Sequence, residues 1–161
     1  DGNGNQQWNQ TFGGTSVDGG SSVQQTTDGG YIITGQTKSF GDTLGDVYLI
    51  KTDGNGNQQW NQTFGGTNDD SGSSVQQTTD GGYIITGSTG SFGNGNGDVY
   101  LIKTDGNGNQ QWNQTFGGTS CDYGSSVQQN THGVSIVTGC RGSSCNGIGA
   151  DYLITTDGIG N

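Results

Sequence analysis

The sequence contains no glutamate and no methionine, and it has a single alanine. These residues are among the strongest helix formers, so their scarcity predicts a chain without helices. All 14 acidic residues are aspartates, which favour turns and loops over helix interiors. The composition therefore indicates an all-β protein that is rich in turns.

Positive charge is also scarce, because three lysines and one arginine leave a formal net charge of −10. The sequence has no basic footprint for nucleic acid and no polybasic patch for a membrane surface. No apolar run approaches the roughly 18 residues that a membrane-spanning helix needs. We therefore expect no nucleic-acid partner and no membrane-spanning segment. Because the sequence begins without Met or a signal peptide, we also expect a processed or partial product.

Large apolar residues are few: Leu, Ile, Val and Phe total 27 of 161 residues. With this net charge, such a composition is typical of disordered chains. However, these residues are gathered in short runs such as YIITG and DVYLI, which are typical of buried strands. Gly and Asn lie between the runs, where turns need them. The pattern predicts a folded chain.

A 52-residue unit is written three times, at residues 1–52, 53–104 and 105–156, and residues 157–161 begin a fourth. We call the three units copies one, two and three. Copies one and two differ at 8 positions, whereas copy three is divergent and contains all the cysteines. A fixed period of this length is typical of stacked structural repeats, and each copy is too poor in apolar side chains to fold alone.

Each copy has four predicted strands, and two of the links between them carry the Asp-Gly and Asn-Gly chemistry of tight hairpins. Four short strands joined in this way predict an antiparallel meander sheet, the blade of a β-propeller. A β-solenoid, with strands stacked along an axis, is a further alternative. In copy one the predicted strands are residues 6–12, 21–26, 31–35 and 47–52, and the tight turns are residues 26–30 and 52–57.

Three segments of the repeat carry a family resemblance: GGYIITG, DVYLIKTD and DGNGNQQWNQTFGG. They resemble the repeats of bacterial and archaeal surface β-propeller proteins and, more distantly, kelch repeats. The resemblance covers all three copies. It implies a propeller exported to a cell surface, where it serves structure or adhesion, and it brings no catalytic residues with it.

Both ends of the sequence fall inside the DGNGN hairpin, so the first strand lacks a preceding VYLIKT partner. The last strand, residues 151–156, lacks a following WNQTF partner. Propellers have four or more blades and this chain supplies three. We therefore expect the open strands to pair with another copy of the chain, in a closed six-bladed ring or a head-to-tail filament. The alternative is that the sequence is a piece of a longer array.

Three N-x-T sequons begin at Asn9, Asn61 and Asn113, each on the predicted wet face of the first strand. They predict a glycoprotein. The alternative is that these residues are simply polar side chains on the outer face of a strand, because the motif is short and common.

Two groups of oxygen ligands are candidates for calcium. Asp1, Asp53 and Asp105 begin Asp-x-Asn-x-Asn patterns, but the acidic residue of a calcium loop at position 12 is missing, which favours a hairpin turn. A second group lies in the two longer loops, which share one end of the predicted blade. It is a candidate face for a cation or another ligand, with solvated loop acids as the alternative. Its members are Asp18, Asp42, Asp46, Asp69, Asp70 and Asp98.

The cysteines are Cys121, Cys140 and Cys145, all predicted in the longer loops of copy three. One alternative is a disulfide from Cys121 to Cys140 or Cys145, and the competing pair is Cys140 with Cys145. A disulfide would fit an oxidising, extracellular setting. Zinc is disfavoured because the only histidine, His132, lies in a tight turn at the opposite end.

Catalysis has no support, since the sequence has no second histidine, no glutamate and no serine with a plausible base. We expect a non-enzymatic extracellular or cell-surface structural protein that self-associates through its end strands. The alternative is a lectin-like or adhesive propeller that binds glycans at its loops. We expect no cofactor, with Ca²⁺ as the weaker expectation.

Overall fold

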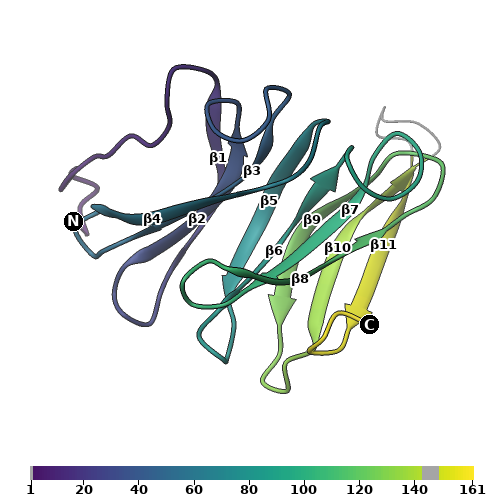
Figure 1. The fold of residues 1–161 in the computed structure, drawn as a ribbon. Helices are drawn as coiled ribbons and strands as arrows, with labels where there is room; N and C mark the ends of the chain where they lie inside the picture. Colours follow the sequence, from purple (N-terminus) through teal and green to yellow (C-terminus); the bar gives the residue numbers. More distant parts are fainter. Residues whose placement is uncertain (1, 143–148) are drawn as a thin grey trace.

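The computed structural model describes residues 2–142 and 149–161. The described residues form eleven β-strands and no helix, as the composition predicted (Figure 1). Accordingly, none of them belongs to a helix long and apolar enough to cross a bilayer. The strands form three antiparallel sheets that follow one another from left to right in Figure 1.

All three sheets are meanders, in which strands that follow in sequence are neighbours in the sheet. Sheet A consists of β1 (Asp18–Gln25), β2 (Tyr31–Thr37), β3 (Asp46–Thr52) and β4 (Gln58–Phe64). Sheet B consists of β5 (Asp70–Gln77), β6 (Tyr83–Thr89), β7 (Asp98–Thr104) and β8 (Gln110–Phe116). Sheet C has three strands, β9 (Asp122–Gln129), β10 (Ser135–Gly142) and β11 (Gly149–Thr156).

Both tight hairpins form where they were predicted. Between β1 and β2 the Thr26 N–H donates to Gly30 O at 2.9 Å, and Gly29 supplies the positive φ of 83° that the turn requires. Between β3 and β4 the Asp53 carboxylate accepts from the N–H groups of the turn it begins. Because successive links alternate, tight turns gather at one end of each sheet and longer loops at the other (Figure 1). We call these the tight-turn end and the long-loop end.

The sheets are out of phase with the sequence copies by one strand. Sheets A and B each take three strands from one copy and their outer strand, β4 or β8, from the next. The predicted strand at residues 6–12 is therefore wrong: these residues pair with no strand, although the same sequence forms β4 and β8. In the structure no strand lies beside them to supply backbone partners, whereas β4 and β8 pair with β3 and β7. Among the described residues, sheet C has no fourth strand.

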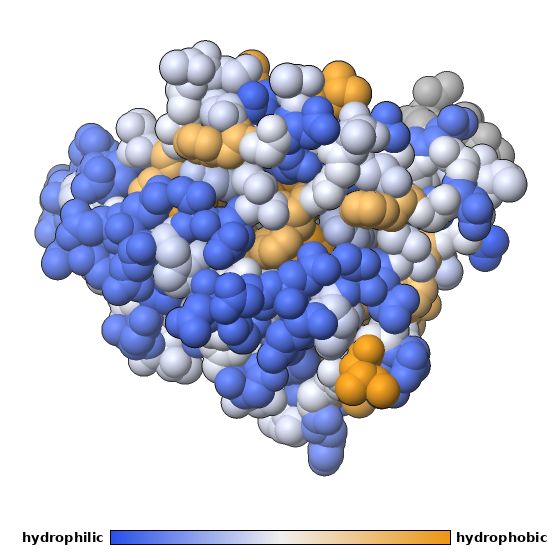
Figure 2. Space-filling view, in the orientation of Figure 1, coloured by the Kyte–Doolittle hydropathy of each residue, from blue (hydrophilic) through white to orange (hydrophobic). Residues whose placement is uncertain are grey.

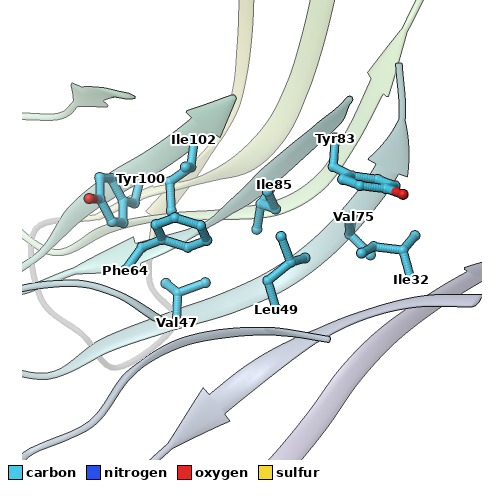
Figure 3. Packing of buried hydrophobic residues seen from close by; sticks show 9 residues of the cluster. All are labelled: Ile32, Val47, Leu49, Phe64, Val75, Tyr83, Ile85, Tyr100 and Ile102. Carbon is cyan, nitrogen blue, oxygen red and sulfur yellow. The ribbon is translucent and has the colours of Figure 1, made fainter. Parts of the chain in front are cut away.

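Neighbouring sheets pack face to face, with β5 against sheet A and β9 against sheet B. Figure 3 shows Ile32 and Leu49 of sheet A pointing toward Val75 and Ile85 of sheet B. A second cluster of the same kind joins sheets B and C. Stacked antiparallel meanders do not fit a β-solenoid, in which strands pair along one axis. The described residues form an open array, with the termini at opposite ends and no closed ring (Figure 1).

Glutamine side chains link the inner strands β1, β5 and β9 of neighbouring sheets. Gln24 Oε1 accepts from the N–H of Gln77 at 2.6 Å, and Gln76 Oε1 accepts from the N–H of Gln129 at 2.5 Å. These bonds satisfy backbone groups on edge strands that would otherwise lack partners. The repeated sequence thus joins adjacent sheets through the same hydrogen bond at equivalent positions.

A buried lysine supports the tight-turn end of sheets A and B. Lys51 is 3% exposed, and its Nζ donates to Asp28 at 2.8 Å and to Gln59 of β4 at 3.1 Å. Lys103 makes the same contacts with Asp80 and with the glutamine of β8. The ammonium group therefore joins the β1–β2 or β5–β6 turn to the outer strand contributed by the next copy.

The close approach of the sheets predicts a steric effect at Gly72. A Cβ added there would lie 2.3 Å from Thr34 Oγ1 and 3.2 Å from Val47 Cγ1 across the interface, whereas a Cβ at the equivalent Gly20 would meet only Ile33, at 3.7 Å. We expect Gly72→Ala to lower the free energy of unfolding by about 1–3 kcal/mol. Gly20→Ala, the control, should leave it nearly unchanged. Urea denaturation measures both, and equal effects would contradict the packing described here.

Candidate functional site

Several apolar residues that are buried in two of the copies are exposed in the copy at the end of the array. Val23 on the free face of sheet A is 63% exposed, whereas the equivalent Val75 and Val127 are 5% and 4% exposed. The latter two face sheet A and sheet B respectively. Val23 thus belongs to an inter-sheet surface that has no partner sheet.

The free face of sheet C shows the complementary difference. Leu153 is 67% exposed, whereas the equivalent Leu49 and Leu101 are fully buried beneath the next sheet. Ile136 is 37% exposed, and the two equivalent isoleucines are likewise fully buried. Ile136 and Leu153 therefore correspond to the residues with which sheets A and B contact the following sheet.

The segment before β1 lies over sheet A much as β4 lies over sheet B. Trp8 contacts Tyr31 with ring centroids 5.9 Å apart, and Trp60 of β4 contacts Tyr83 at 5.8 Å. This segment leaves an apolar hollow of about 280 Å³ on the free face. The hollow is lined by Trp8, Phe12, Val23, Tyr31, Ile33, Thr52 and Gly56.

Copy three departs from this pattern at the start of β11. Ala150 and Asp151 replace the Asp-Val pair that begins β3 and β7. Val47 and Val99 are buried between sheets, whereas Asp151 is exposed on the free face of sheet C. A carboxylate thus stands where the two internal interfaces have an apolar side chain.

At the long-loop end, the structure brings aspartates of neighbouring sheets together. A Cβ on Gly65 would lie 2.0 Å from Asp46 Oδ1 of sheet A and 2.6 Å from Asp70 Oδ2 of sheet B. Gly117 has the same relation to Asp98 of sheet B and Asp122 of sheet C, at 1.9 and 2.7 Å. We call Asp46 with Asp70, and Asp98 with Asp122, the two carboxylate pairs.

The carboxylate pairs are held in the interface by their own backbone. The N–H of Asp70 donates to Gly45 O at 2.8 Å, and the N–H of Asp122 makes the same bond with Gly97. All four aspartates are buried, and Asp70 is fully so. One oxygen of Asp70 (Oδ1) and one of Asp122 (Oδ1) are buried without a hydrogen-bond partner. Such oxygens are rare in native proteins and call for a physical reason.

The crowding of these carboxylates affects the pKa values of the groups around them. Burial raises the pKa of Asp46, and the carboxylate of Asp70 raises it further. Burial together with Asp122 does the same for the pKa of Asp98. Burial, with the charges of Asp70 and Asp46, also raises the pKa of Tyr100 to about 12. The region is therefore unfavourable for negative charge unless a proton or cation accompanies it.

Asp18 is equivalent to Asp70 but faces no second sheet. Its carboxylate accepts hydrogen bonds from Gly14 N–H at 2.9 Å, from Ser39 Oγ at 2.6 Å and from the Thr37 hydroxyl. Burial opposes ionisation of Asp18, but the hydrogen bonds from Ser39 and Thr37 outweigh it and lower its pKa to about 2. Asp70 keeps the equivalents of the first two bonds, from Gly66 N–H at 2.9 Å and Ser91 Oγ at 2.6 Å, but its Oδ1 lacks the equivalent of the third.

The remaining predicted metal ligands are tied to the protein itself. Asp42 donates its backbone N–H to Asp46, and Asp69 Oδ1 accepts from Gln36 Nε2 at 2.6 Å. Asp53 Oδ2 accepts from Asn57 Nδ2 at 2.9 Å, so the Asp-x-Asn-x-Asn pattern forms a turn, as favoured from sequence. Across residues 2–142 and 149–161, no three His, Cys, Asp or Glu side chains form a metal-binding group. Sequence reasoning missed Asp122, because the pairing crosses copies.

A larger hollow of about 630 Å³ opens at the long-loop end between loops of all three sheets. Asn68, Asn96, Asp69 and Tyr123 contribute polar groups to it, and Asp122 of the second carboxylate pair also lines its wall. Tyr123 is 43% exposed. The hollow thus combines amides, two carboxylates and an aromatic ring on the face that sequence reasoning proposed for a ligand.

The three sequons lie on or before the outer strands. Asn113 of β8 and Asn9 are exposed, whereas Asn61 of β4 is half-buried. The face that carries β4 and β8 is covered mainly by hydrophilic residues (Figure 2). This placement leaves glycosylation a prediction, with Asn9 and Asn113 as the more accessible acceptors.

Of the cysteines, Cys140 is a free thiol, so both pairings that use it are wrong for this structure. Cys121 is buried just before β9, with its Sγ 3.7 Å from Asn96 O. Cys145 lies outside the described residues, and its pairing with Cys121 stays a prediction. His132 is in the β9–β10 turn at the tight-turn end, away from these cysteines as expected.

Comparison with known proteins adds no family to this description. No protein-family model matches the chain, and a search of curated proteins finds no match. The resemblance to surface β-propeller repeats stays a prediction. Functional inference therefore depends on the geometry of the end faces and of the long-loop end.

The raised pKa of Asp46 predicts that its ionised form destabilises the fold in metal-free buffer. The penalty is absent below the unfolded pKa, near 3.8, and complete once the pH exceeds the raised folded pKa. We expect Asp46→Asn to raise the free energy of unfolding near neutral pH but not at about pH 3. Asp18→Asn, the control with a lowered pKa, should destabilise near neutral pH. Urea denaturation at both pH values measures this, and a destabilised Asp46→Asn near neutral pH would contradict it.

Proposed function

We propose that the protein is an extracellular structural repeat protein that self-associates head to tail, the free face of sheet C binding the free face of sheet A of another copy. The product would be a closed propeller-type ring or a surface filament. The observation that carries the proposal is the exposure of Val23 at one end and of Leu153 at the other, when every equivalent residue is buried. No catalytic step is part of this function.

The internal interfaces supply the template for this contact. In the cluster between sheets A and B, Ile32 and Leu49 of sheet A lie against Val75 and Ile85 of sheet B. At the free ends the corresponding side chains are Ile136 and Leu153 from one copy and those around the 280 Å³ hollow from the other. Ile136 and Leu153 would therefore fill the hollow beside Trp8. Residues 6–12 would gain β11 as their missing strand partner.

Asp151 makes the intermolecular interface weaker than the internal ones. Its carboxylate would take the place of Val47 and Val99, which are 1% and 0% exposed. Burial of an unpaired carboxylate is costly, so the contact would be reversible instead of permanent. The neighbouring Ala150 removes the carboxylate that would otherwise crowd Asp18.

An extracellular location agrees with the exposed sequons at Asn9 and Asn113 and with the predicted disulfide of Cys121 with Cys145. It also agrees with the resemblance to surface propellers. A surface array would place the hydrophilic outer strands β4 and β8 toward solvent (Figure 2). Glycans on those strands would not obstruct the end faces.

Substitutions at the free face of sheet C test the association. We expect the wild-type chain to show a mass above that of a monomer, rising with concentration. Leu153→Lys should abolish this by placing a charge in the hollow, whereas Asp151→Val should lower the dissociation constant tenfold or more, about 1.4 kcal/mol. Leu44→Lys is the matched control, because Leu44 is a 50% exposed leucine in a loop outside the end faces. Sedimentation velocity over a concentration series measures all four proteins.

A wild-type chain that remains a monodisperse monomer at high concentration would overturn the proposal and favour a piece of a longer array. Equal behaviour of Leu153→Lys and Leu44→Lys would also overturn it, since association would then not use the free face. Electron microscopy of associating samples distinguishes rings from filaments.

A second candidate function, a glycan-binding module, is favoured by the 630 Å³ hollow at the long-loop end. Amide and carboxylate groups bind sugar hydroxyls, and an aromatic ring packs on the apolar face of a sugar. We expect Tyr123→Ala to lower retention on a glycan array at least fivefold if this function holds. Phe92→Ala, an exposed aromatic outside the hollow, is the control. Absence of any retained glycan for the wild type would count against this function.

A further inference from the structure

We propose that the two carboxylate pairs, Asp46 with Asp70 and Asp98 with Asp122, bind hard divalent cations of the Ca²⁺ class between neighbouring sheets. Each ion would contact one aspartate from each sheet and so join two sheets through their carboxylates. The proposal concerns the inside of one chain, so it does not depend on self-association.

The first reason is the close approach of two carboxylates from neighbouring sheets. Asp46 Oδ1 and Asp70 Oδ2 both lie within 2.6 Å of the Cβ position of Gly65, so the two carboxylates are close neighbours across the interface. Asp98 Oδ1 and Asp122 Oδ2 lie within 2.7 Å of the Cβ position of Gly117 in the same way. The arrangement occurs at both internal interfaces, so it is a property of the repeat and not of one loop.

The second reason is the buried oxygen atoms that lack a partner. Asp70 is fully buried and Asp122 is 2% exposed, yet Oδ1 of each accepts no hydrogen bond. The other oxygen of each is bonded: Asp70 Oδ2 accepts from Gly66 N–H at 2.9 Å and from Ser91 Oγ at 2.6 Å, and Asp122 Oδ2 accepts from Gly118 N–H at 2.8 Å. The unpartnered Oδ1 atoms are thus free to coordinate an ion while the loops hold the carboxylates in place.

The third reason is that no lysine or arginine of the described residues forms an ion pair with either carboxylate pair. Within the described residues, the ion pairs are Lys51 with Asp28 and Lys103 with Asp80, both at the tight-turn end. Arg141 lies over the ring of Tyr152 instead, with its Cζ 5.7 Å from the centroid. Two buried carboxylates without a cation are costly to ionise, and a bound divalent cation would remove that cost.

Carboxylate oxygens are the ligands that Ca²⁺ prefers, and its flexible coordination accepts two protein carboxylates completed by main-chain oxygens and water. Mg²⁺ requires a near-ideal octahedron and retains its water more strongly. Asp122 lines the 630 Å³ hollow, which gives solvent and ions a route to the second pair. We therefore expect Ca²⁺ to bind in preference to Mg²⁺, with a Kd of roughly 10⁻⁵ to 10⁻³ M.

Asp18, on the free face of sheet A, can be compared with the two carboxylate pairs. Asp18 has three hydrogen bonds and no facing carboxylate, and Ala150 replaces the aspartate that would face it from another copy. Asp18 therefore does not need an ion. The expected stoichiometry is two Ca²⁺ per chain, one for each internal interface.

The test is equilibrium dialysis of the chelator-treated wild-type chain against ⁴⁵Ca²⁺, with thermal unfolding in EDTA, CaCl₂ and MgCl₂. We expect two ions bound per chain and a higher Tm in CaCl₂, because an ion that binds only the folded state stabilises it. Asp122→Asn should bind one ion, and the double variant Asp70→Asn/Asp122→Asn should bind none and show no Tm response to CaCl₂. Asp18→Asn, the control, should keep both ions.

Tb³⁺ luminescence gives a second readout, since Tyr100 is close enough to Asp46 and Asp70 for their charges to affect it. Excitation of the aromatic residues should sensitise bound Tb³⁺, and excess Ca²⁺ should displace it. Lack of bound ⁴⁵Ca²⁺ and of a Tm response in the wild type at millimolar CaCl₂ would overturn the proposal. In that case protonation of Asp46 and Asp98, whose pKa values are raised, would relieve the crowding without an ion. Unchanged binding in the double variant would equally overturn it.

Discussion

Burial of one sheet's face by the next is the interaction on which the whole structure depends. No sheet of this chain has enough apolar side chains to form a core by itself, so each uses its neighbour's. Val75 shows the effect most directly: it is 5% exposed beneath sheet A, while the identical residue of sheet A, Val23, is 63% exposed because nothing covers it. The same sequence is therefore core or surface according to whether a neighbouring sheet is present.

The one-strand offset between sequence copies and sheets strengthens this dependence. Because β4 belongs to copy two, sheet A is not complete until the next copy has been added. The outer strand also brings Trp60 against Tyr83 of the following sheet. Neighbouring sheets are thus joined by a shared copy, by the apolar interface and by the glutamine bonds of the inner strands.

Copy three shows which parts of the repeat act together. Where Thr155 replaces the buried lysine, His132 replaces the aspartate that this lysine binds in the other copies. Both changes coincide with the absence of an outer strand to supply the glutamine acceptor. At the other end of β11, Ala150 replaces a member of the carboxylate pairs, again where no following sheet is present. Each loss removes a group whose partner is also missing.

Local chemistry alone determined the all-β class, the strands β1 to β3, the tight hairpins and the separation of the two ends of each sheet, because turn residues and β-branched runs act over a few neighbours. Only the tertiary structure decided that residues 6–12 form no strand, since a strand requires a backbone partner. It also decided that Asp46 meets Asp70 and Asp98 meets Asp122, residues of different sheets. Contacts between sheets depend on how their faces stack. The spacing of residues along one copy does not show which residues of different sheets meet.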